Sequence, residues 1–261
     1  MKAFRLFSVS IALLLLASCM RAQTQPVRVA AAADLQFAMK DLSGKYEAKT
    51  GVKVEASYGS SGNFRAQIEN GAPFDVFFSA DSQYPEQLVS AGAADAASMF
   101  VYAQGHLVLW APKNESLQLS QRGFDALKES GVVKIAIANP EHAPYGRAAV
   151  AALQKAGLYD ELKPKLVLGE NISQAAQFAQ SGSAQVGIIA LSLTYAASMK
   201  DGERWEIPAS YYPPILQKAV IVSASKNKAA AQAFLEFVKS DEGRKILSSY
   251  GLTRPETASK P

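Results

Sequence analysis

Residues 52–81 read VKVEASYGSSGNFRAQIENGAPFDVFFSAD, and this stretch decides the fold. Val52 to Ser57 alternates as a strand does, Phe64 to Asn70 has helical spacing, and Phe74 to Phe78 is the short apolar run of a buried strand. Gly71 ends the helix. The order strand, helix, strand predicts a βαβ unit with parallel strands.

The same alternation continues on both sides of this unit. Further strands are predicted at 27–30, 107–111, 133–138, 165–168, 186–190 and 218–224, and further helices at 35–46, 83–91, 147–156, 174–181 and along an apolar stripe from 230 to 250. This order is typical of α/β proteins with mostly parallel sheets flanked by helices. Because one sheet holding all these strands would be very large, we expect two lobes.

The boundaries between the lobes are predicted from two stretches that look like crossings. These are Ala103-Gln104-Gly105 and Pro213-Pro214. We therefore assign residues 27–104 together with 215–261 to lobe 1, and residues 105–214 to lobe 2.

The N-terminus has the pattern of an export signal. Lys2 and Arg5 precede an apolar run from Leu6 to Ala17, which is too short to remain as a transmembrane helix. The run ends in Leu16-Ala17-Ser18-Cys19, which resembles a bacterial lipobox. We predict a signal peptide at residues 1–18 and a lipid anchor on Cys19, which places the protein in the periplasm, tethered to the membrane. The alternative is an ordinary signal peptide cut after Ala22.

Cysteine usage and charge narrow the function further. Cys19 is the only cysteine, so the chain has no internal disulfide. Removal of Lys2 and Arg5 with the signal leaves 25 basic residues against 23 acidic ones, a net charge of about +2. Because the basic residues are scattered, the sequence gives no support to nucleic-acid binding.

Four predicted strand-to-helix turns carry small and polar residues. They are Ala31-Ala32-Ala33-Asp34, Tyr58 to Asn63, Asn139 to Gly146, and Gly169 to Ser173. Backbone N–H groups at a helix N-terminus are unpaired and favour an anion. Only Arg147 brings a basic side chain near any of these turns, so an anion held there would be bound by dipoles and hydroxyls. The alternative is that these residues are ordinary helix caps.

Several motifs together resemble the periplasmic molybdate-binding proteins of molybdate ABC transporters. The motifs are Val29 to Leu35, Ser60-Ser61, Gly71 to Asp81, Asn139 to Pro144 and Tyr250-Gly251-Leu252. The resemblance covers nearly the whole mature chain. It implies a two-lobed periplasmic-binding-protein type II fold with two crossover strands, a bound molybdate or tungstate, and delivery to an ABC permease in the inner membrane. We expect no cofactor and a monomer; the metal would be bound only as its oxyanion, through the oxygens.

The resemblance also implies the site residues. A serine donor falls on Ser61 and backbone donors fall on Tyr145 and Ile172. The other serine of the family is replaced by Asp34, and the tyrosine that supplies a hydroxyl is replaced by Ala190. Ser60 and Ser192 are weaker candidates; Ser192, or the side chain of Tyr145, would replace the lost hydroxyl.

Asp34 conflicts with binding of a dianion. A carboxylate about 4 Å from two negative charges costs about 8 kcal/mol at an effective dielectric constant of 20. Our preferred hypothesis is that Asp34 caps the following helix by accepting the amide of Gln36 or Phe37. The alternative is a protonated ligand, such as hydrogen phosphate, that donates to Asp34. Sulfate-like and phosphate-like anions therefore stay open.

Two functions of other classes compete with anion binding. A hydrolase would need one of the only two histidines, His106 and His142, beside Ser60 or Ser61, but the Gly-x-Ser-x-Gly spacing of a nucleophile elbow is absent. The sequence shows neither a metal-ligand cluster nor the helix-turn-helix of a regulator. We expect a binding protein and not an enzyme.

Overall fold

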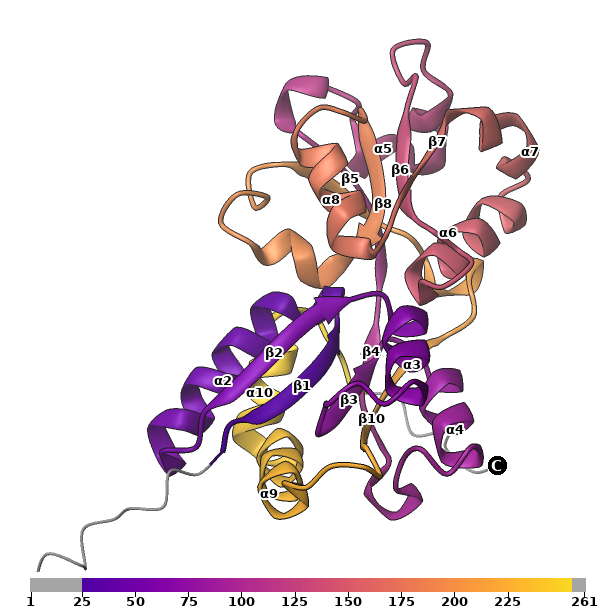
Figure 1. The fold of residues 1–261 in the computed structure, drawn as a ribbon. Helices are drawn as coiled ribbons and strands as arrows, with labels where there is room; N and C mark the ends of the chain where they lie inside the picture. Colours follow the sequence, from indigo (N-terminus) through magenta and orange to yellow (C-terminus); the bar gives the residue numbers. More distant parts are fainter. Residues whose placement is uncertain (1–24, 255–261) are drawn as a thin grey trace, which may run out of the picture.

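The computed structural model describes residues 25–254, arranged as two α/β lobes (Figure 1). Lobe 1 contains a five-stranded sheet of order β2-β1-β3-β10-β4, and lobe 2 one of order β7-β6-β8-β5-β9. The strands are β1 (Val27–Ala32), β2 (Val54–Gly59), β3 (Val76–Ser79), β4 (Phe100–Gly105), β5 (Leu107–Ala111), β6 (Ile135–Ala138), β7 (Leu166–Gly169), β8 (Val186–Ala190), β9 (Glu203–Glu206) and β10 (Ile215–Ile221). The predicted α/β class and two-sheet architecture are confirmed.

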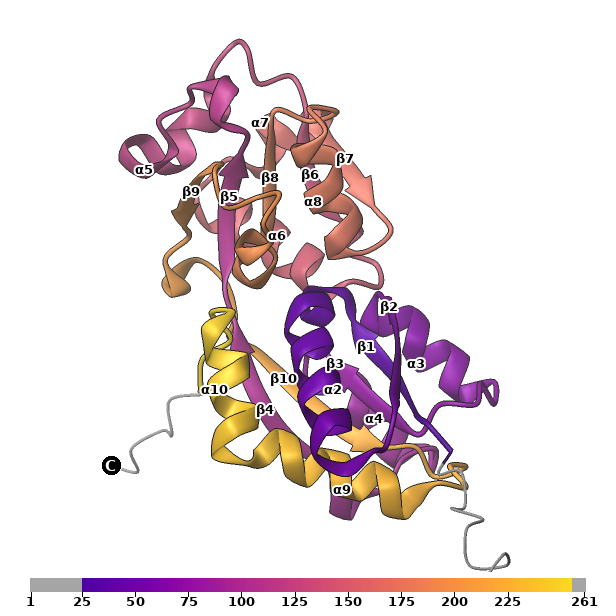
Figure 2. The same cartoon turned by 90° about the vertical axis from the view of Figure 1, so that its left-hand side faces the viewer.

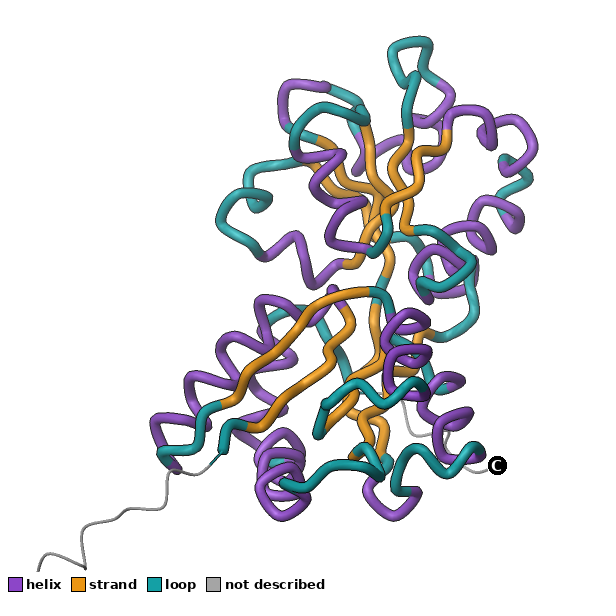
Figure 3. The backbone as a smooth tube through the Cα atoms, in the orientation of Figure 1, coloured by secondary structure: helices purple, strands orange, loops and turns teal. Residues whose placement is uncertain are grey.

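Helices cover both sheets, as Figure 3 shows by colour. They are α2 (Gln36–Thr50), α3 (Ser61–Glu69), α4 (Gln83–Ser90), α5 (Leu119–Arg122), α6 (Pro144–Lys155), α7 (Tyr159–Leu162), α8 (Ile172–Gln180), α9 (Lys228–Lys239) and α10 (Asp241–Ser249). Among residues 25–254, none of these helices has both the length and the apolar character needed to cross a bilayer. The predicted signal peptide and Cys19 lie outside the described residues.

The sheet of lobe 1 separates two apolar layers. β1 pairs in parallel with β2 and β3, whereas β10 runs antiparallel to both β3 and β4. Successive side chains of a strand face opposite sides. Accordingly Phe78 packs with Phe234 of α9 on one face, and Phe77 packs with the apolar residues of α3 and α4 on the other.

Lobe 2 repeats this plan with its own core. β6 pairs in parallel with β7 and β8, and β5 runs antiparallel to β8 and β9. All four residues of β6 and all five of β5 and of β8 are buried, as expected for central strands covered by helices on both faces.

The chain passes between the lobes twice. β4 leads through His106 directly into β5, and the segment Tyr212-Pro213-Pro214 leads into β10. Figure 2 shows β4 and β5 as one nearly continuous path from one lobe to the other. Because both crossings lie close together, they form a hinge on one side of the interface between the lobes.

Three local predictions were wrong in instructive ways. β4 and β9 were not predicted, because each lies at the edge of its sheet and carries exposed residues. The apolar stripe after residue 230 forms two helices, because Ser240 is extended and its side chain caps α10 at Gly243. Helix α6 begins at Pro144, three residues before its predicted start, since proline is well suited to the first turn of a helix.

The first turn of α6 lies very close to the end of β6. A Cβ on Gly146 would come within 2.2 Å of the carbonyl oxygen of Ala138. A glycine at this position therefore allows the helix N-terminus to approach the sheet, which sets the position of the loop from Asn139 to Ala143.

Gly146→Ala should therefore destabilise the protein. We expect the free energy of unfolding in urea to fall by about 1–3 kcal/mol, because the added methyl group cannot be accommodated without moving backbone. The matched control is Gly44→Ala in the exposed middle of α2, where nothing lies within 4 Å of an added Cβ. That control should gain up to about 1 kcal/mol from helix propensity. Equal effects of both substitutions would contradict the close packing of α6 on β6.

Candidate functional site

A small cavity lies between the lobes where all four predicted turns converge. Its volume is about 10 Å³, which is room for about one water-sized sphere. Lobe 1 lines it with Ala32, Ala33, Asp34, Gly59, Ser60, Ser61 and Ala80, and lobe 2 with Ala143, Pro144, Tyr145 and Ile172. Residues from the ends of three lobe 1 strands thus face two helix N-termini of lobe 2.

Two backbone donors of lobe 2 are available at this cavity. Tyr145 is in the first turn of the 12-residue helix α6, and Ile172 begins the 9-residue helix α8. Within residues 25–254 neither N–H has a hydrogen-bond acceptor. The side chain of Asn171 accepts the N–H groups of Ser173 and Gln174, at 3.0 and 3.1 Å, and leaves the N–H of Ile172 free. Both helix dipoles favour negative charge at this place.

Ser61 provides a hydroxyl donor from lobe 1. It is buried at the start of α3, and its Oγ accepts the N–H of Ala80 at 3.0 Å. That contact uses a lone pair of the hydroxyl and leaves its hydrogen available for a ligand.

Ser60, by contrast, is engaged in a contact between the lobes. Its Oγ lies 2.9 Å from Nδ1 of His142, and the N–H of Gly62 donates to the carbonyl oxygen of His142 at 2.9 Å. Glu170 is the third member of this group, since its carboxylate accepts from Asn63 and lies 3.6 Å from Nε2 of His142.

Asp34 is buried in the interface and does not cap a helix. The hydroxyl of Tyr145 and Nε2 of Gln217 both donate to its Oδ2, at 3.0 and 2.7 Å. Its Oδ1 has no hydrogen-bond partner within the described chain. The predicted capping role is wrong because Asp34 lies inside a 3-10 turn, Ala33–Leu35, in which the carbonyl oxygen of Ala33 already accepts the amide of Gln36.

Burial changes the acidity of this cluster. Desolvation raises the pKa of Asp34 from 3.8 to about 6, although the hydrogen bonds from Gln217 and Tyr145 oppose the shift. Burial, followed by the nearby Asp34 carboxylate, raises the pKa of the Tyr145 hydroxyl well above its usual value. The tyrosine therefore stays neutral and acts as a donor.

Gln217 was not found from the sequence, although a signal was present. In β10 the residues Ile215, Gln217 and Ala219 alternate with more exposed neighbours, so an uncharged amide occupies a buried position. A polar side chain in the buried register of a strand requires a partner. Here the partners are Asp34 and Tyr145, the latter 3.0 Å from Nε2 of Gln217.

Ser192 and Ala190 do not line the cavity. The hydroxyl of Ser192 donates to the backbone oxygen of Asp34 at 2.8 Å, so it holds the turn in place from behind. Ala190 is fully buried in the core of lobe 2. Of the two candidates for the missing hydroxyl, only Tyr145 is at the cavity, and its hydroxyl is directed to Asp34.

In the part of the chain that the structure describes, no cationic side chain lines the cavity. The guanidinium of Arg147 lies 2.5 Å from Asp81 and donates to the hydroxyl of Tyr84 at 2.9 Å. Within residues 25–254 there is also no group of three His, Cys, Asp or Glu side chains that could hold a metal ion. The cavity therefore offers neutral donors and one carboxylate.

The Ser60–His142 pair is the contact that a hydrolase would use. Ser60 is buried, and its hydroxyl is held by a contact with His142 of the opposite lobe. In addition, the distance from His142 to Glu170, 3.6 Å, is longer than a hydrogen bond. The contact is suited to joining the lobes.

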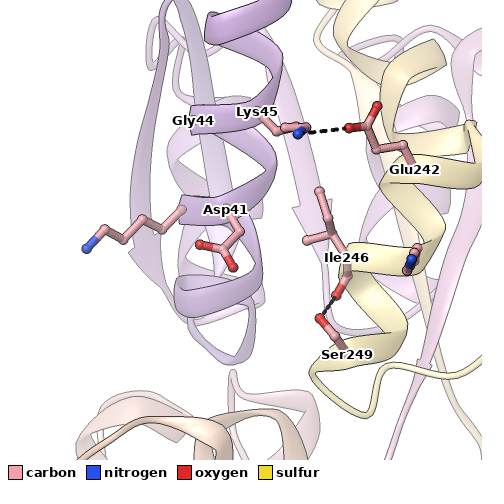
Figure 4. Close-up of a pocket in the computed structure, with 8 residues that line it drawn as sticks. Asp41, Gly44, Lys45, Glu242, Ile246 and Ser249 are labelled. Carbon is pink, nitrogen blue, oxygen red and sulfur yellow. Dashed lines mark hydrogen bonds and ion pairs between the residues drawn. The ribbon is translucent and has the colours of Figure 1, made fainter.

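A larger cavity lies elsewhere, in a groove between α2 and α10 (Figure 4). It has a volume of about 710 Å³ and is lined by long surface side chains, among which Lys45 and Glu242 form an ion pair at 3.5 Å. None of the four turns contributes to it.

The sequence profile of the family described as "Bacterial extracellular solute-binding protein" matches residues 27–253. The chain belongs to this family.

Two molybdate-binding proteins and one solved structure are similar to this chain over most of their length. The chain is 42% identical to the molybdate-binding protein ModA of Azotobacter vinelandii over 231 residues, 88% of this chain and 90% of that protein. It is 40% identical to ModA of Rhodobacter capsulatus over 225 residues, 86% and 87% of the two chains. The solved structure of the Azotobacter vinelandii periplasmic molybdate-binding protein matches with a TM-score of 0.83 at 38% identity, covering 88% of this chain and 100% of that one. The resemblance inferred from the motifs is confirmed.

For this member of the solute-binding family, the buried carboxylate predicts pH-dependent stability. The pKa of Asp34 is higher in the folded protein than in the unfolded chain, so the resulting stabilisation is fully present below about pH 3.8 and is lost as the pH rises through about 6. Asp34→Asn, which stays neutral, should exceed the wild type in free energy of unfolding by about 3 kcal/mol at pH 8.

The difference should shrink as the pH falls toward 4, and urea denaturation at several pH values would measure it. A difference between the two proteins that is the same at pH 8 and pH 4.5 would show that the carboxylate of Asp34 is not desolvated.

Proposed function

We propose that the chain binds a tetrahedral oxyanion, molybdate or tungstate, between its lobes and delivers it to the permease of an ABC importer. One observation carries this proposal: the free N–H groups of Tyr145 and Ile172 meet the hydroxyl of Ser61 at one cavity. The names of the relatives from Azotobacter vinelandii and Rhodobacter capsulatus, which are molybdate-binding proteins, support the choice of anion.

The arrangement suits an anion held without a counter-charge. Each hydrogen bond to a charged group contributes roughly 1.5–3 kcal/mol, and the three donors come from both lobes. Such a site selects by the number and placement of donors. The ion needs more room than about 10 Å³, so the lobes separate to admit it and close again on it.

The anion stabilises the closed arrangement, because donors from both lobes are satisfied together only when it is present. The contacts that already join the lobes, such as Arg147 with Asp81, would guide the same closing movement. We propose that the protein works in this way as a monomer and without a cofactor, and that it catalyses no reaction.

Binding measurements on purified protein test the proposal. We expect molybdate and tungstate to bind in titration calorimetry, with much weaker binding of sulfate and phosphate. Ser61→Ala should weaken molybdate binding by about 10- to 150-fold, because one hydrogen bond to the anion is lost.

The matched control is Ser240→Ala. Like Ser61, Ser240 lies at the start of a helix and its hydroxyl accepts a backbone N–H, that of Gly243 at 3.2 Å. Unlike Ser61, it does not line the cavity. This variant should bind molybdate as the wild type does. Tight binding of phosphate alone, or equal effects of the two substitutions, would contradict the proposal.

We further propose that Cys19 carries a lipid that tethers the protein to the periplasmic side of the membrane. The full chain expressed in a Gram-negative host should incorporate labelled palmitate and sediment with membranes. Cys19→Ser should lose the label and become soluble in the periplasm. An unlabelled, soluble wild-type protein would show that the signal peptide is an ordinary one.

A further inference from the structure

The least satisfied polar cluster in the described chain lies at the proposed anion site. It consists of Asp34, Tyr145 and Gln217, and all three side chains are buried. Two of their oxygens, Oδ1 of Asp34 and Oε1 of Gln217, lack a hydrogen-bond partner among the described residues. Buried oxygens without a donor are uncommon and call for an explanation.

The geometry fixes which oxygen of Asp34 is available. Tyr145 and Gln217 both donate to Oδ2, and Gln217 also contacts the hydroxyl of Tyr145, so the three groups hold one another in place. Oδ1 is left over on a residue that lines the cavity. Any interaction of the carboxyl group with a ligand therefore uses Oδ1.

An ionised Asp34 would repel the anion that the site is built to hold. Among the described residues no cation lines the cavity to offset the repulsion, and the guanidinium of Arg147 on α6 is paired with Asp81. Like charges in a dry site disfavour each other strongly, and the usual outcome is that one group takes up a proton.

Taking the proposed function as given, we propose that Asp34 binds the anion as a neutral carboxylic acid whose Oδ1 donates its proton to an anion oxygen. The proton comes from solution, so each anion bound takes up one proton. Asp34 then supplies a donor from lobe 1 beside Ser61, and the site favours anions that only accept hydrogen bonds.

The carboxylate of Asp34 can take up this proton near neutral pH. Its pKa of about 6 arises from burial and is opposed by the hydrogen bonds it accepts; no charged neighbour causes the shift. At pH 7 about one molecule in ten already carries the proton, so protonation costs about tenfold in affinity.

Other titratable or charged groups on the surrounding elements are either paired, neutral or on the exposed side. Helix α8 contributes none. The others are Arg28 of β1, Lys40, Asp41, Lys45, Tyr46, Glu47 and Lys49 of α2, Glu55 and Tyr58 of β2, Arg65 and Glu69 of α3, Asp81 after β3, Tyr102 of β4, Glu141 and His142 before α6, Arg147 and Lys155 of α6, Glu170 before α8, Tyr195 after β8, Tyr212 before β10, and Lys218 of β10. Tyr102 is buried near Asp34, and burial followed by the Asp34 charge raises its pKa well above its usual value, so it stays protonated.

Protonation of Asp34 makes the affinity for molybdate depend on pH. Binding uses the protonated form, so the affinity for molybdate is level well below pH 6 and falls by up to tenfold per pH unit above it. Between pH 6 and pH 8 the affinity should fall about 50-fold.

Titration calorimetry of the mature protein with molybdate measures the protons directly. At pH 7.5, in two buffers with different heats of ionisation, we expect close to one proton taken up per anion. Asp34→Asn should bind molybdate with no proton uptake and with an affinity that is the same at pH 6 and pH 8. Asp41→Asn, which removes an exposed carboxylate outside the cavity, should keep both the uptake and the pH dependence of the wild type.

The possible results distinguish a failure of the proposed role of Asp34 from a failure of the proposed function. Molybdate binding by the wild type without proton uptake overturns the role of Asp34 and leaves the proposed function standing. Proton uptake that persists in Asp34→Asn assigns it to another group and also overturns that role. Binding of hydrogen phosphate without uptake, lost in Asp34→Asn, would mean that the carboxylate accepts a proton from the ligand. Absence of any oxyanion binding at pH 6 would overturn the proposed function as well.

Discussion

The hydrogen bonds that Tyr145 and Gln217 donate to Asp34 are the constraint on which the interface between the lobes depends. They join the end of β1 to the start of α6 and to the crossover strand β10 in a place without solvent. The first crossing requires a glycine at position 105, because a Cβ on Gly105 would lie 2.1 Å from the Tyr145 hydroxyl. The hinge, the helix N-terminus and the buried acid therefore fit together as one unit.

The proposed anion site would use the backbone where many anion sites use arginine or lysine. Two helix N-termini of lobe 2 face a hydroxyl and an acid of lobe 1, and the guanidinium of Arg147 on α6 is occupied by Asp81. A cation would attract any anion, whereas fixed donors favour an ion with oxygens at matching positions. The small residues before Asp34 allow this approach, since Ala32 and Ala33 line the cavity with little more than backbone.

The sequence predicted the parts of the fold that rest on periodicity. Buried central strands such as 107–111 and 186–190 were placed to the residue, because long apolar runs leave few alternatives. Edge strand β9 was missed, because its residues Glu203–Glu206 are half exposed and pair on one side only. The four turns were found because small and polar residues follow the strands, but their convergence depends on how the lobes meet. The partners of Asp34 could not be predicted, since Tyr145 and Gln217 are 111 and 183 residues away in the sequence.

The central claim is that an oxyanion is held by peptide N–H groups of lobe 2 and not by a cationic side chain. Amide proton chemical shifts, recorded by NMR during titration of the isotopically labelled protein with molybdate, test this claim most directly. We expect the largest downfield shifts at the N–H groups of Tyr145 and Ile172. Shifts confined to the Arg147 side chain or to the groove between α2 and α10, with these two amides unchanged, would contradict it.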